Sequence, residues 1–249
     1  MSEFERDAAE GIHRIEDAYV NWYLVEDGER LTIVDTGHPR SWRSLQEALR
    51  TLGRQPTDIE AIVLTHGHFD HMGFARRAQQ ELGVPVLAPE GELELVARPW
   101  SYDHERSRVR NAIEHPGFLR VFTAMGAAGA LQVRGTQDVT AYGPQEVLDV
   151  PGRPQVVPCP GHTHGHCALF FPDRGALIAG DAVVTFNPYT TGHGPQIVAG
   201  AATANSTLAL SSLQALAGTD ADHVLTGHGP VWRQGIGAAV DHARAVGPT

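Results

Sequence analysis

One short segment of the chain carries a dense group of side chains that bind metals. The run Thr65-His66-Gly67-His68-Phe69-Asp70-His71 places three imidazoles and one carboxylate within six residues, directly after a short apolar segment. Imidazole and carboxylate are good ligands for Zn²⁺, and a turn-rich loop can aim alternate side chains at one point. We therefore expect His66 and His68 to share one metal ion, and Asp70 and His71 a neighbouring one. A histidine-rich surface loop is the alternative interpretation.

Further ligands must come from elsewhere, because a catalytic zinc ion takes three protein ligands and keeps one position open. Three later segments offer them: His162 in Pro160-Gly161-His162-Thr163-His164-Gly165-His166, Asp181 in Ala179-Gly180-Asp181-Ala182, and His228 in Thr226-Gly227-His228-Gly229. Each segment follows a predicted strand and contains glycines, which allow backbones to approach closely. The sequence therefore predicts one site assembled from distant loops.

This order of motifs resembles the metallo-β-lactamase superfamily, in which HxHxDH is followed by a histidine in a PGHT segment, a bridging aspartate and a late histidine. The resemblance covers nearly the whole chain. It implies an α/β fold, an αβ/βα four-layer sandwich, and a centre with two Zn²⁺ ions, iron or manganese being the other candidate metals. It also implies the ligands: His66, His68 and His162 for the first ion, Asp70, His71 and His228 for the second, and Asp181 as the bridge.

Three histidine and aspartate residues near the motifs have alternative interpretations. Asp35, in Val34-Asp35-Thr36-Gly37, is either a turn residue after a strand or an acceptor that fixes a ligand histidine. His164 and His166 are interpreted as residues that support the ligands or line the pocket, because members of the family usually bind metal through the first histidine of that segment.

The substrate pocket is expected on loops near the bridging aspartate. Phe186, Tyr189 and His193 follow Asp181 on a loop rich in glycine and proline, a position that often lines the pocket in this family. Packing in the core or within the loop is the alternative. Trp100 and Tyr102 are further, weaker candidates.

The surrounding pattern predicts the elements that position these loops. The β-branched run 61–64 predicts a buried strand that ends at the HxHxDH loop, and the apolar stripe between Pro39 and Gly53 predicts a helix. We expect one domain over residues 1–249, with a helical insertion over the active site at about residues 90–130. Its helices are predicted at 92–98, 103–114 and 118–125. Other strands are expected at 11–16, 20–26, 30–35, 84–88, 146–150, 155–158, 167–171, 176–179 and 223–226, and other helices at 74–82, 204–217 and 235–246.

Composition and charge exclude several classes of protein. The net charge of −10 argues against a nucleic-acid binder, and the 19 basic residues are all arginine. A chain without lysine has no lysine nucleophile, Schiff base or P-loop lysine. Between Arg98 and Arg120, however, five arginines face three acidic residues. This segment is either an ordinary solvated helix or a clamp for an anionic substrate.

The termini and cysteines bear on location. The polar, acidic N-terminal residues and the lack of a long apolar stretch predict a cytoplasmic protein that does not contact membranes. Cys159 and Cys167 are expected to be packed or idle thiols in a reducing compartment. The number of subunits stays open.

The expected reaction is hydrolysis of an ester, thioester or lactone in a small-molecule substrate. Two Zn²⁺ ions would share an attacking hydroxide, with Asp181 as the bridge and Asp70 orienting the nucleophile or moving its proton. A β-lactamase role is not expected, because the family's β-lactamases have cysteine in place of Asp181 or lack the bridging aspartate. The alternatives are an iron persulfide dioxygenase that uses His66, His162 and Asp181, a phosphodiesterase of the same fold, and a non-catalytic metal-binding scaffold.

Overall fold

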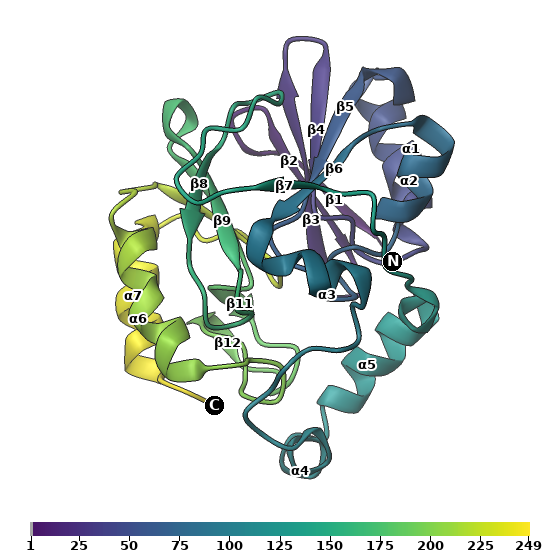
Figure 1. Cartoon of the computed structure of the whole chain (residues 1–249). Coiled ribbons are helices and arrows are strands. Elements are labelled where there is room, and N and C mark those ends of the chain that lie inside the picture. The colour runs from purple at the N-terminus through teal and green to yellow at the C-terminus, as the bar shows by residue number, and fades with distance from the viewer. Residues whose placement is uncertain (1) are drawn as a thin grey trace.

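Two β-sheets packed face to face form the centre of the molecule in this computed structural model, which describes residues 2–249 (Figure 1). The larger sheet contains seven strands in chain order; the first four are antiparallel, and the fourth to seventh are parallel. These strands are β1 (Glu3–Ala9), β2 (Ile12–Asp17), β3 (Val20–Asp27), β4 (Arg30–Val34), β5 (Ile59–Val63), β6 (Val86–Pro89) and β7 (Thr140–Tyr142).

The smaller sheet has four strands in the order β13-β10-β9-β8. Their bounds are β8 (Gln155–Pro158), β9 (Cys167–Phe171), β10 (Ala176–Gly180) and β13 (His223–Thr226). The last of these runs parallel to β10, whereas β9 is antiparallel to both of its neighbours. Two short strands, β11 (Val184–Phe186) and β12 (His193–Gln196), form a separate ribbon.

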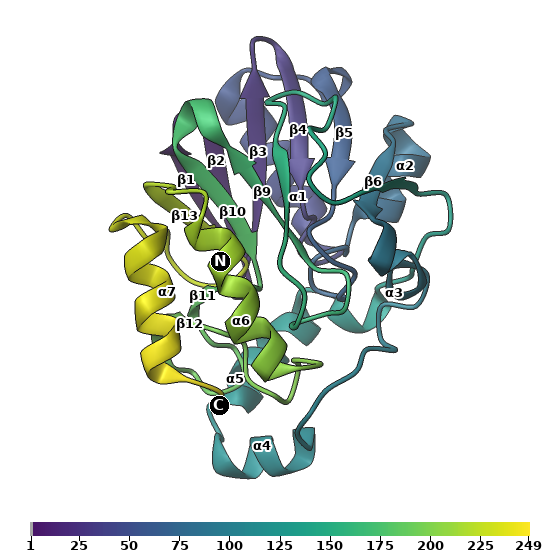
Figure 2. The same ribbon diagram turned by 60° about the vertical axis from the view of Figure 1, so that its left-hand side comes forward.

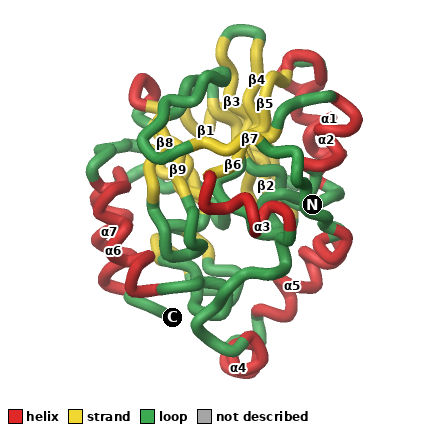
Figure 3. The backbone as a smooth tube through the Cα atoms, in the orientation of Figure 1, coloured by secondary structure: helices red, strands yellow, loops and turns green. Residues whose placement is uncertain are grey.

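Four helices cover the outer faces of the two sheets, as Figures 2 and 3 show. They are α1 (Ser41–Leu52) and α2 (Ala75–Leu82) on the larger sheet, and α6 (Ser206–Ala217) and α7 (Gly235–Val246) on the smaller. The first of them ends at Gly53, whose left-handed conformation (φ 70°) closes the helix as predicted.

Three layers of apolar side chains pack between the four layers of helices and sheets. Along β3, Trp22 and Leu24 face the helices α1 and α2, whereas Tyr23 and Val25 face the second sheet, as the alternation of a strand requires. A third layer joins the smaller sheet to α6 and α7. The expected αβ/βα four-layer sandwich is thus confirmed.

The predicted helical insertion lies between β6 and β7 and is also confirmed. It contains α3 (Leu93–Ala97), α4 (Arg108–Glu114) and α5 (Phe118–Ala127), with short 3₁₀ turns at Glu90–Glu92 and Ala130–Gln132. In both views α4 and α5 lie at the end of the molecule that also holds the β11-β12 ribbon (Figures 1 and 2). Within residues 2–249, no helix has the length and apolar character needed to span a membrane.

Two of the predicted elements are wrong. The segment 146–150 is no strand: Val147 makes one isolated bridge to Gln155, because a turn follows at once and leaves little length to pair. The helix predicted at 103–114 begins only at Arg108, after the cap Ser107. Residues before it bond to another segment instead, since the amide of Glu105 donates to the Thr203 carbonyl oxygen.

Candidate metal centre

The candidate ligands lie on loops at the carboxyl ends of strands from both sheets. The HxHxDH loop follows β5 of the larger sheet, and His162, Asp181 and His228 follow β8, β10 and β13 of the smaller one. Carboxyl ends of strands are where α/β folds commonly place their sites. The sequence-predicted residues are therefore brought to one edge of the sandwich, where all seven are buried.

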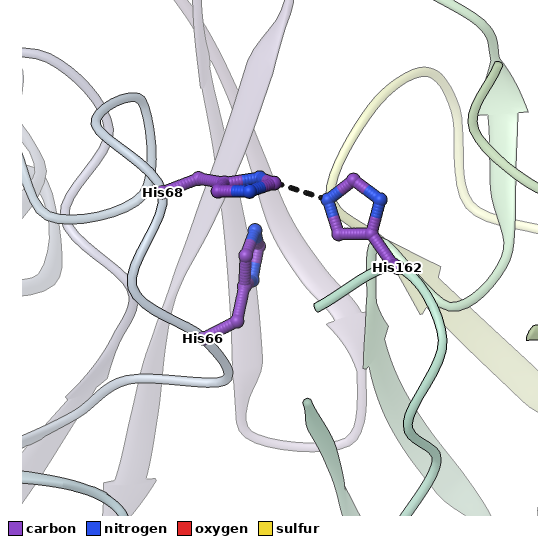
Figure 4. Close-up of side chains that lie close together, drawn as sticks. All are labelled: His66, His68 and His162. Atoms are coloured by element: carbon purple, nitrogen blue, oxygen red, sulfur yellow. Dashed lines mark hydrogen bonds between the residues drawn. The ribbon is translucent and has the colours of Figure 1, made fainter. Parts of the chain in front are cut away.

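The seven residues form two adjacent groups with Asp181 between them. The ligand atoms of His66, His68 and His162 lie within 4.8 Å of one another, and so do those of Asp70, His71 and His228. Figure 4 shows the first group, in which Nδ1 of His68 lies 2.9 Å from Nε2 of His162.

Asp181 reaches both groups. One carboxylate oxygen, Oδ2, lies 3.4 Å from Nε2 of His162 and 3.2 Å from Nε2 of His228. The other, Oδ1, lies 3.4 Å from Nε2 of His71. A carboxylate in this position is able to bridge two cations.

Glycine at two positions makes this approach possible. A methyl group on Gly227 would overlap Oδ1 of Asp181. A methyl group on Gly180, which has a left-handed φ of 51°, would lie 2.8 Å from Oγ1 of Thr65 and 2.9 Å from Nε2 of His166. Steric crowding thus explains why the residues before Asp181 and His228 are glycines.

Two threonines determine which nitrogen of a candidate ligand carries its proton. The Thr65 hydroxyl donates to Oδ2 of Asp35 and also contacts Nδ1 of His66 at 3.0 Å. A hydroxyl has a single hydrogen, so that imidazole must donate from Nδ1. The Thr203 hydroxyl likewise donates to the Val198 carbonyl oxygen and must accept from Nδ1 of His162. In both rings the lone pair is left on Nε2, facing the site.

The two histidines of the second group are oriented by acceptors alone. Nδ1 of His71 lies 3.0 Å from Oδ2 of Asp35, and Nδ1 of His228 lies 2.6 Å from the Tyr19 carbonyl oxygen. Both Nδ1 atoms must therefore donate, which directs Nε2 into the site. Of the two interpretations of Asp35, the structure favours the acceptor that fixes a ligand histidine.

Several buried atoms of the centre have no hydrogen-bond partner among the described residues. They are Nε2 of His66, His68 and His71, and Oδ1 of Asp181. A buried polar atom without a partner costs about 1–3 kcal/mol, and a divalent cation between these donors would remove that cost. The residues present thus fit a metal centre with nitrogen and oxygen ligands.

Buried carboxylates and imidazoles shift one another's pKa values. Burial opposes a charge on His71, but Asp181 and Asp35 outweigh it and raise the pKa of His71 to about 10. Burial likewise opposes a charge on Asp181, yet His228 and His71 hold its pKa well below the usual range. Burial lowers the pKa of His162 to about 4. The first group therefore presents neutral imidazoles, and the second holds positive charge against its carboxylates.

Glu92 is a buried residue of this region that the sequence analysis missed. Its carboxylate accepts from the Gly67 amide of the HxHxDH loop at 2.8 Å and from the Gly165 amide of the PGHTHGH loop at 2.7 Å. One side chain thus joins two loops that carry candidate ligands. No local motif marks it, because its partners lie far away in the sequence.

His164 and His166, the other two histidines of the PGHTHGH loop, have different surroundings. His166 is buried and accepts the Asp181 amide on Nε2 at 3.1 Å, so it supports the backbone of Asp181. His164 is exposed and lies 2.9 Å from Oδ2 of Asp103. It lines a cavity of about 170 Å³ that His162 also lines.

The three predicted substrate residues are not equivalent. The Phe186 amide donates to the His228 carbonyl oxygen, and its ring stacks on Tyr19, so Phe186 lies directly beside the second group. His193 is exposed and lies against the Phe186 ring. Tyr189 lies farther along, where its hydroxyl is 3.2 Å from that of Tyr102.

Tyr102 is the residue of the insertion that contacts the centre. Its ring lies 4.2 Å from the His68 ring, centroid to centroid, and it lines the same cavity as His162. Burial raises the pKa of Tyr102, Arg108 opposes this rise, and Asp70 adds to it, so the hydroxyl lies within the electrostatic reach of both charges. Trp100 instead stacks on Phe69.

Fold and site together indicate a metal-dependent hydrolase with two adjacent groups of candidate ligands. Comparison with known proteins agrees: the model of the metallo-beta-lactamase superfamily matches residues 15–228. The chain belongs to this superfamily, and the family resemblance seen in the sequence is confirmed.

Two relatives illustrate the range of this family. The probable metallo-hydrolase YflN of Bacillus subtilis is 27% identical over 236 residues, which are 90% of this chain and 85% of that protein. The acyl-coenzyme A thioesterase MBLAC2 of Homo sapiens is 30% identical over 177 residues, covering 66% of this chain and 58% of the relative. The chain thus aligns with less than two thirds of the thioesterase.

Solved structures show the same architecture. The metallo-beta-lactamase family protein TTHA1429 of Thermus thermophilus matches with a TM-score of 0.66 and 26% identity over 91% of this chain and 74% of that chain. TTHA1623, in a di-iron-bound form, matches with a TM-score of 0.57 and 27% identity over 88% and 92% of the two chains. The di-zinc enzyme LRA-12 from an Alaskan soil metagenome matches with a TM-score of 0.67 over 98% of this chain and 92% of that chain. Because the two sequences are only 17% identical, this match shows the fold alone.

Proposed function

We propose that this metallo-hydrolase holds two zinc ions and cleaves an ester, thioester or lactone bond. His66, His68 and His162 would hold one ion, Asp70, His71 and His228 the other, and Asp181 would bridge them. The observation that carries the proposal is the position of Asp181, whose two oxygens lie within 3.4 Å of imidazoles from both groups.

The two ions would lower the pKa of water and polarise the scissile carbonyl. The protein's own part is to fix the orientation of the ligand imidazoles. Asp35, Thr65 and Thr203 fix the imidazoles so that Nε2 faces the site without rearrangement. Preorganised ligands of this kind need no reorganisation when substrate binds.

Asp70 is proposed to orient the attacking group or to move its proton. Its carboxylate is buried, and Oδ2 lies 3.7 Å from Nε2 of His228. Burial raises the pKa of Asp70. A raised pKa makes a carboxyl group a better proton acceptor than an ordinary aspartate.

The thioester is the first substrate class to test, because a relative carries the name acyl-coenzyme A thioesterase. The iron alternative keeps one specific observation in its favour, since the related TTHA1623 has been solved in a di-iron form. The identity of the bound metal therefore separates the main proposal from an iron oxidoreductase of the same fold.

The test is metal content per chain by plasma mass spectrometry on protein purified without added metal, together with a screen of thioesters, lactones and phosphodiesters. We expect about two zinc ions per chain, since the site offers two groups of ligands. Asp181→Ala should lower both zinc content and turnover sharply. One iron per chain with oxygen consumption on persulfides, or unchanged kinetics in Asp181→Ala, would overturn the proposal.

A further inference from the structure

The insertion brings a group of hydrogen-bond donors to the rim of the metal centre. Tyr102 lies against His68, and the guanidinium of Arg108 lies over the Tyr102 ring, with its carbon 4.3 Å from the ring centroid. The Tyr189 hydroxyl reaches the Tyr102 hydroxyl from the loop after β11. These three side chains, the donor group, come from two segments far apart in the sequence.

The hydroxyl groups of Tyr102 and Tyr189 carry two hydrogens, and only one of these is donated to a partner within the described protein. The two hydroxyls lie 3.2 Å apart, so one donates to the other, and neither has a further partner among residues 2–249. A phenol carries a single hydrogen and stays protonated at neutral pH. The pair therefore presents one O–H that has no acceptor within the described protein.

Arg108 differs from Arg98 and Arg110 of the insertion, each of which lies beside a glutamate. Arg98 lies 3.5 Å from Glu94, and Arg110 lies 2.7 Å from Glu114. In the described part of the chain, Arg108 makes no ion pair; its Nε donates to the Ala201 carbonyl oxygen at 3.4 Å. Its two terminal nitrogens are left for another acceptor.

The donor group is held in place from several sides. The Asn111 side chain donates to the Tyr189 carbonyl oxygen at 3.0 Å, and Phe118 stacks on the Tyr189 ring at 5.1 Å. Glu105 accepts from the amide of Ser206 at the start of α6, which attaches the insertion to the second half of the fold. A fixed set of donors recognises an oxygen group at a lower entropic cost than flexible side chains do.

We propose that Arg108, Tyr102 and Tyr189 bind a negatively charged oxygen group of the substrate, a carboxylate or a phosphoryl group, while the metal centre holds the scissile bond. This inference rests on the proposed function and narrows it to anionic esters, thioesters or lactones. A planar guanidinium supplies donors only, and the tyrosine pair adds one O–H that has no other acceptor within residues 2–249, a combination that suits recognition of such an anion.

The nearby carboxylates do not oppose this assignment. Asp70 is one of the proposed ligands, so a bound cation would offset its charge. Asp103 lies beside His164, and Glu94 beside Arg98. Arg108 makes no ion pair within residues 2–249, and its guanidinium lies over the ring of Tyr102.

The test is calorimetric binding of glutarate and butyrate to the zinc-loaded protein. Both acids offer one carboxylate to the metal centre, and glutarate carries a second for the donor group. We expect glutarate to bind about ten- to a hundredfold more tightly, as for a hydrogen-bonded charge pair. Arg108→Gln should abolish this difference, and Tyr102→Phe and Tyr189→Phe should reduce it. Arg110→Gln, on the same helix but paired with Glu114, is the matched control and should keep it.

Zinc content and hydrolysis of 4-nitrophenyl butyrate are measured in every variant. An equal affinity for the two acids in the wild type, or a difference that survives Arg108→Gln, would overturn the inference even where the neutral ester is cleaved. 3-Phosphonopropionate is the second probe. If its affinity, and not that of glutarate, depends on Arg108, the group recognised is phosphoryl. A glutarate preference without any ester hydrolysis would contradict the proposed function alone.

Discussion

At the scale of single residues, Asp35 shows how one buried carboxylate serves several parts of the centre. It accepts from Nδ1 of His71 and from both the amide and the hydroxyl of Thr65. Its backbone has a left-handed φ of 56°, a conformation that the short polar side chains of aspartate and asparagine tolerate. Asparagine would fit this backbone but would offer one acceptor oxygen to three donors.

We therefore expect Asp35→Asn to weaken zinc binding about ten- to a hundredfold, as is usual when the partner of a ligand histidine is lost. The measurement is competition with a chromophoric chelator. Asp58→Asn, in an exposed turn after Pro56, is the control and should bind zinc as the wild type does. Equal affinities for wild type and Asp35→Asn would show that His71 is oriented by other means.

A substitution at Gly227 tests the proposed bridge by Asp181 without changing any polar atom. Its added methyl group in Gly227→Ala would overlap Asp181 and press on His71, so both must shift. We expect the zinc content to fall from two ions per chain toward one or none. Gly237→Ala, on α7 with no atom near the new methyl group, should keep both ions and be slightly more stable. Two bound zinc ions in Gly227→Ala would argue against the bridge.

At the scale of elements, Glu92 connects the loops after β5 and β8. In Glu92→Gln an amide group would replace one of the two acceptor oxygens and face a backbone N–H of Gly67 or Gly165. We expect a loss of about 1–3 kcal/mol of unfolding free energy from the unpaired amide, and weaker zinc binding. Glu94→Gln, with 85% of its side chain exposed, is the control. Thermal unfolding of zinc-loaded and chelated protein measures both effects, and no difference from Glu94→Gln would count against this role.

The sequence predicts those elements whose signals are local. The strand before the HxHxDH loop and the helix that ends at Gly53 carry their own apolar period and stop signal. In contrast, β1 was not predicted: it is largely polar and only its last two residues are buried, so its pairing with β2 is what makes it a strand. The residues 103–107 were predicted to be helical, yet their bonds to residues 200–206 override that propensity.

The residues of the candidate site likewise divide into those that the sequence predicted and those that it did not. The ligand residues were found because their types, spacing and order are visible along the chain. Thr203 and Glu92 were not singled out, because each acts on a partner that the fold brings from a distant segment. Arg108 was one of five arginines in the segment interpreted as a solvated helix or an anion clamp, and only the fold places it over Tyr102. Supporting contacts of this kind depend on three-dimensional placement and leave no periodic pattern.

At the scale of the whole molecule, the candidate metal centre joins the two sheets and consists of buried carboxylates and imidazoles. Metal binding is therefore coupled to the charge of these side chains. In the protein alone, Asp181 and Asp35 overcome the effect of burial and raise the pKa of His71 to about 10, and the pKa of His228 is raised as well. Below its raised pKa the His71 imidazole retains its proton, whereas a metal ligand must offer a lone pair. Zinc must therefore displace the proton of His71 at pH 7. His162, with a pKa of about 4, should release none.

It follows that apparent zinc affinity should rise about tenfold per pH unit between pH 6 and pH 8, since the displaced proton becomes more dilute. Calorimetry in buffers of different ionisation enthalpy counts displaced protons directly. His71→Ala provides the comparison, because it removes the group with the highest raised pKa, and the proton count should fall by about one. A binding enthalpy independent of the buffer would mean that the second group already presents neutral imidazoles, and that the carboxylates of Asp181 and Asp35 are compensated by some other charge.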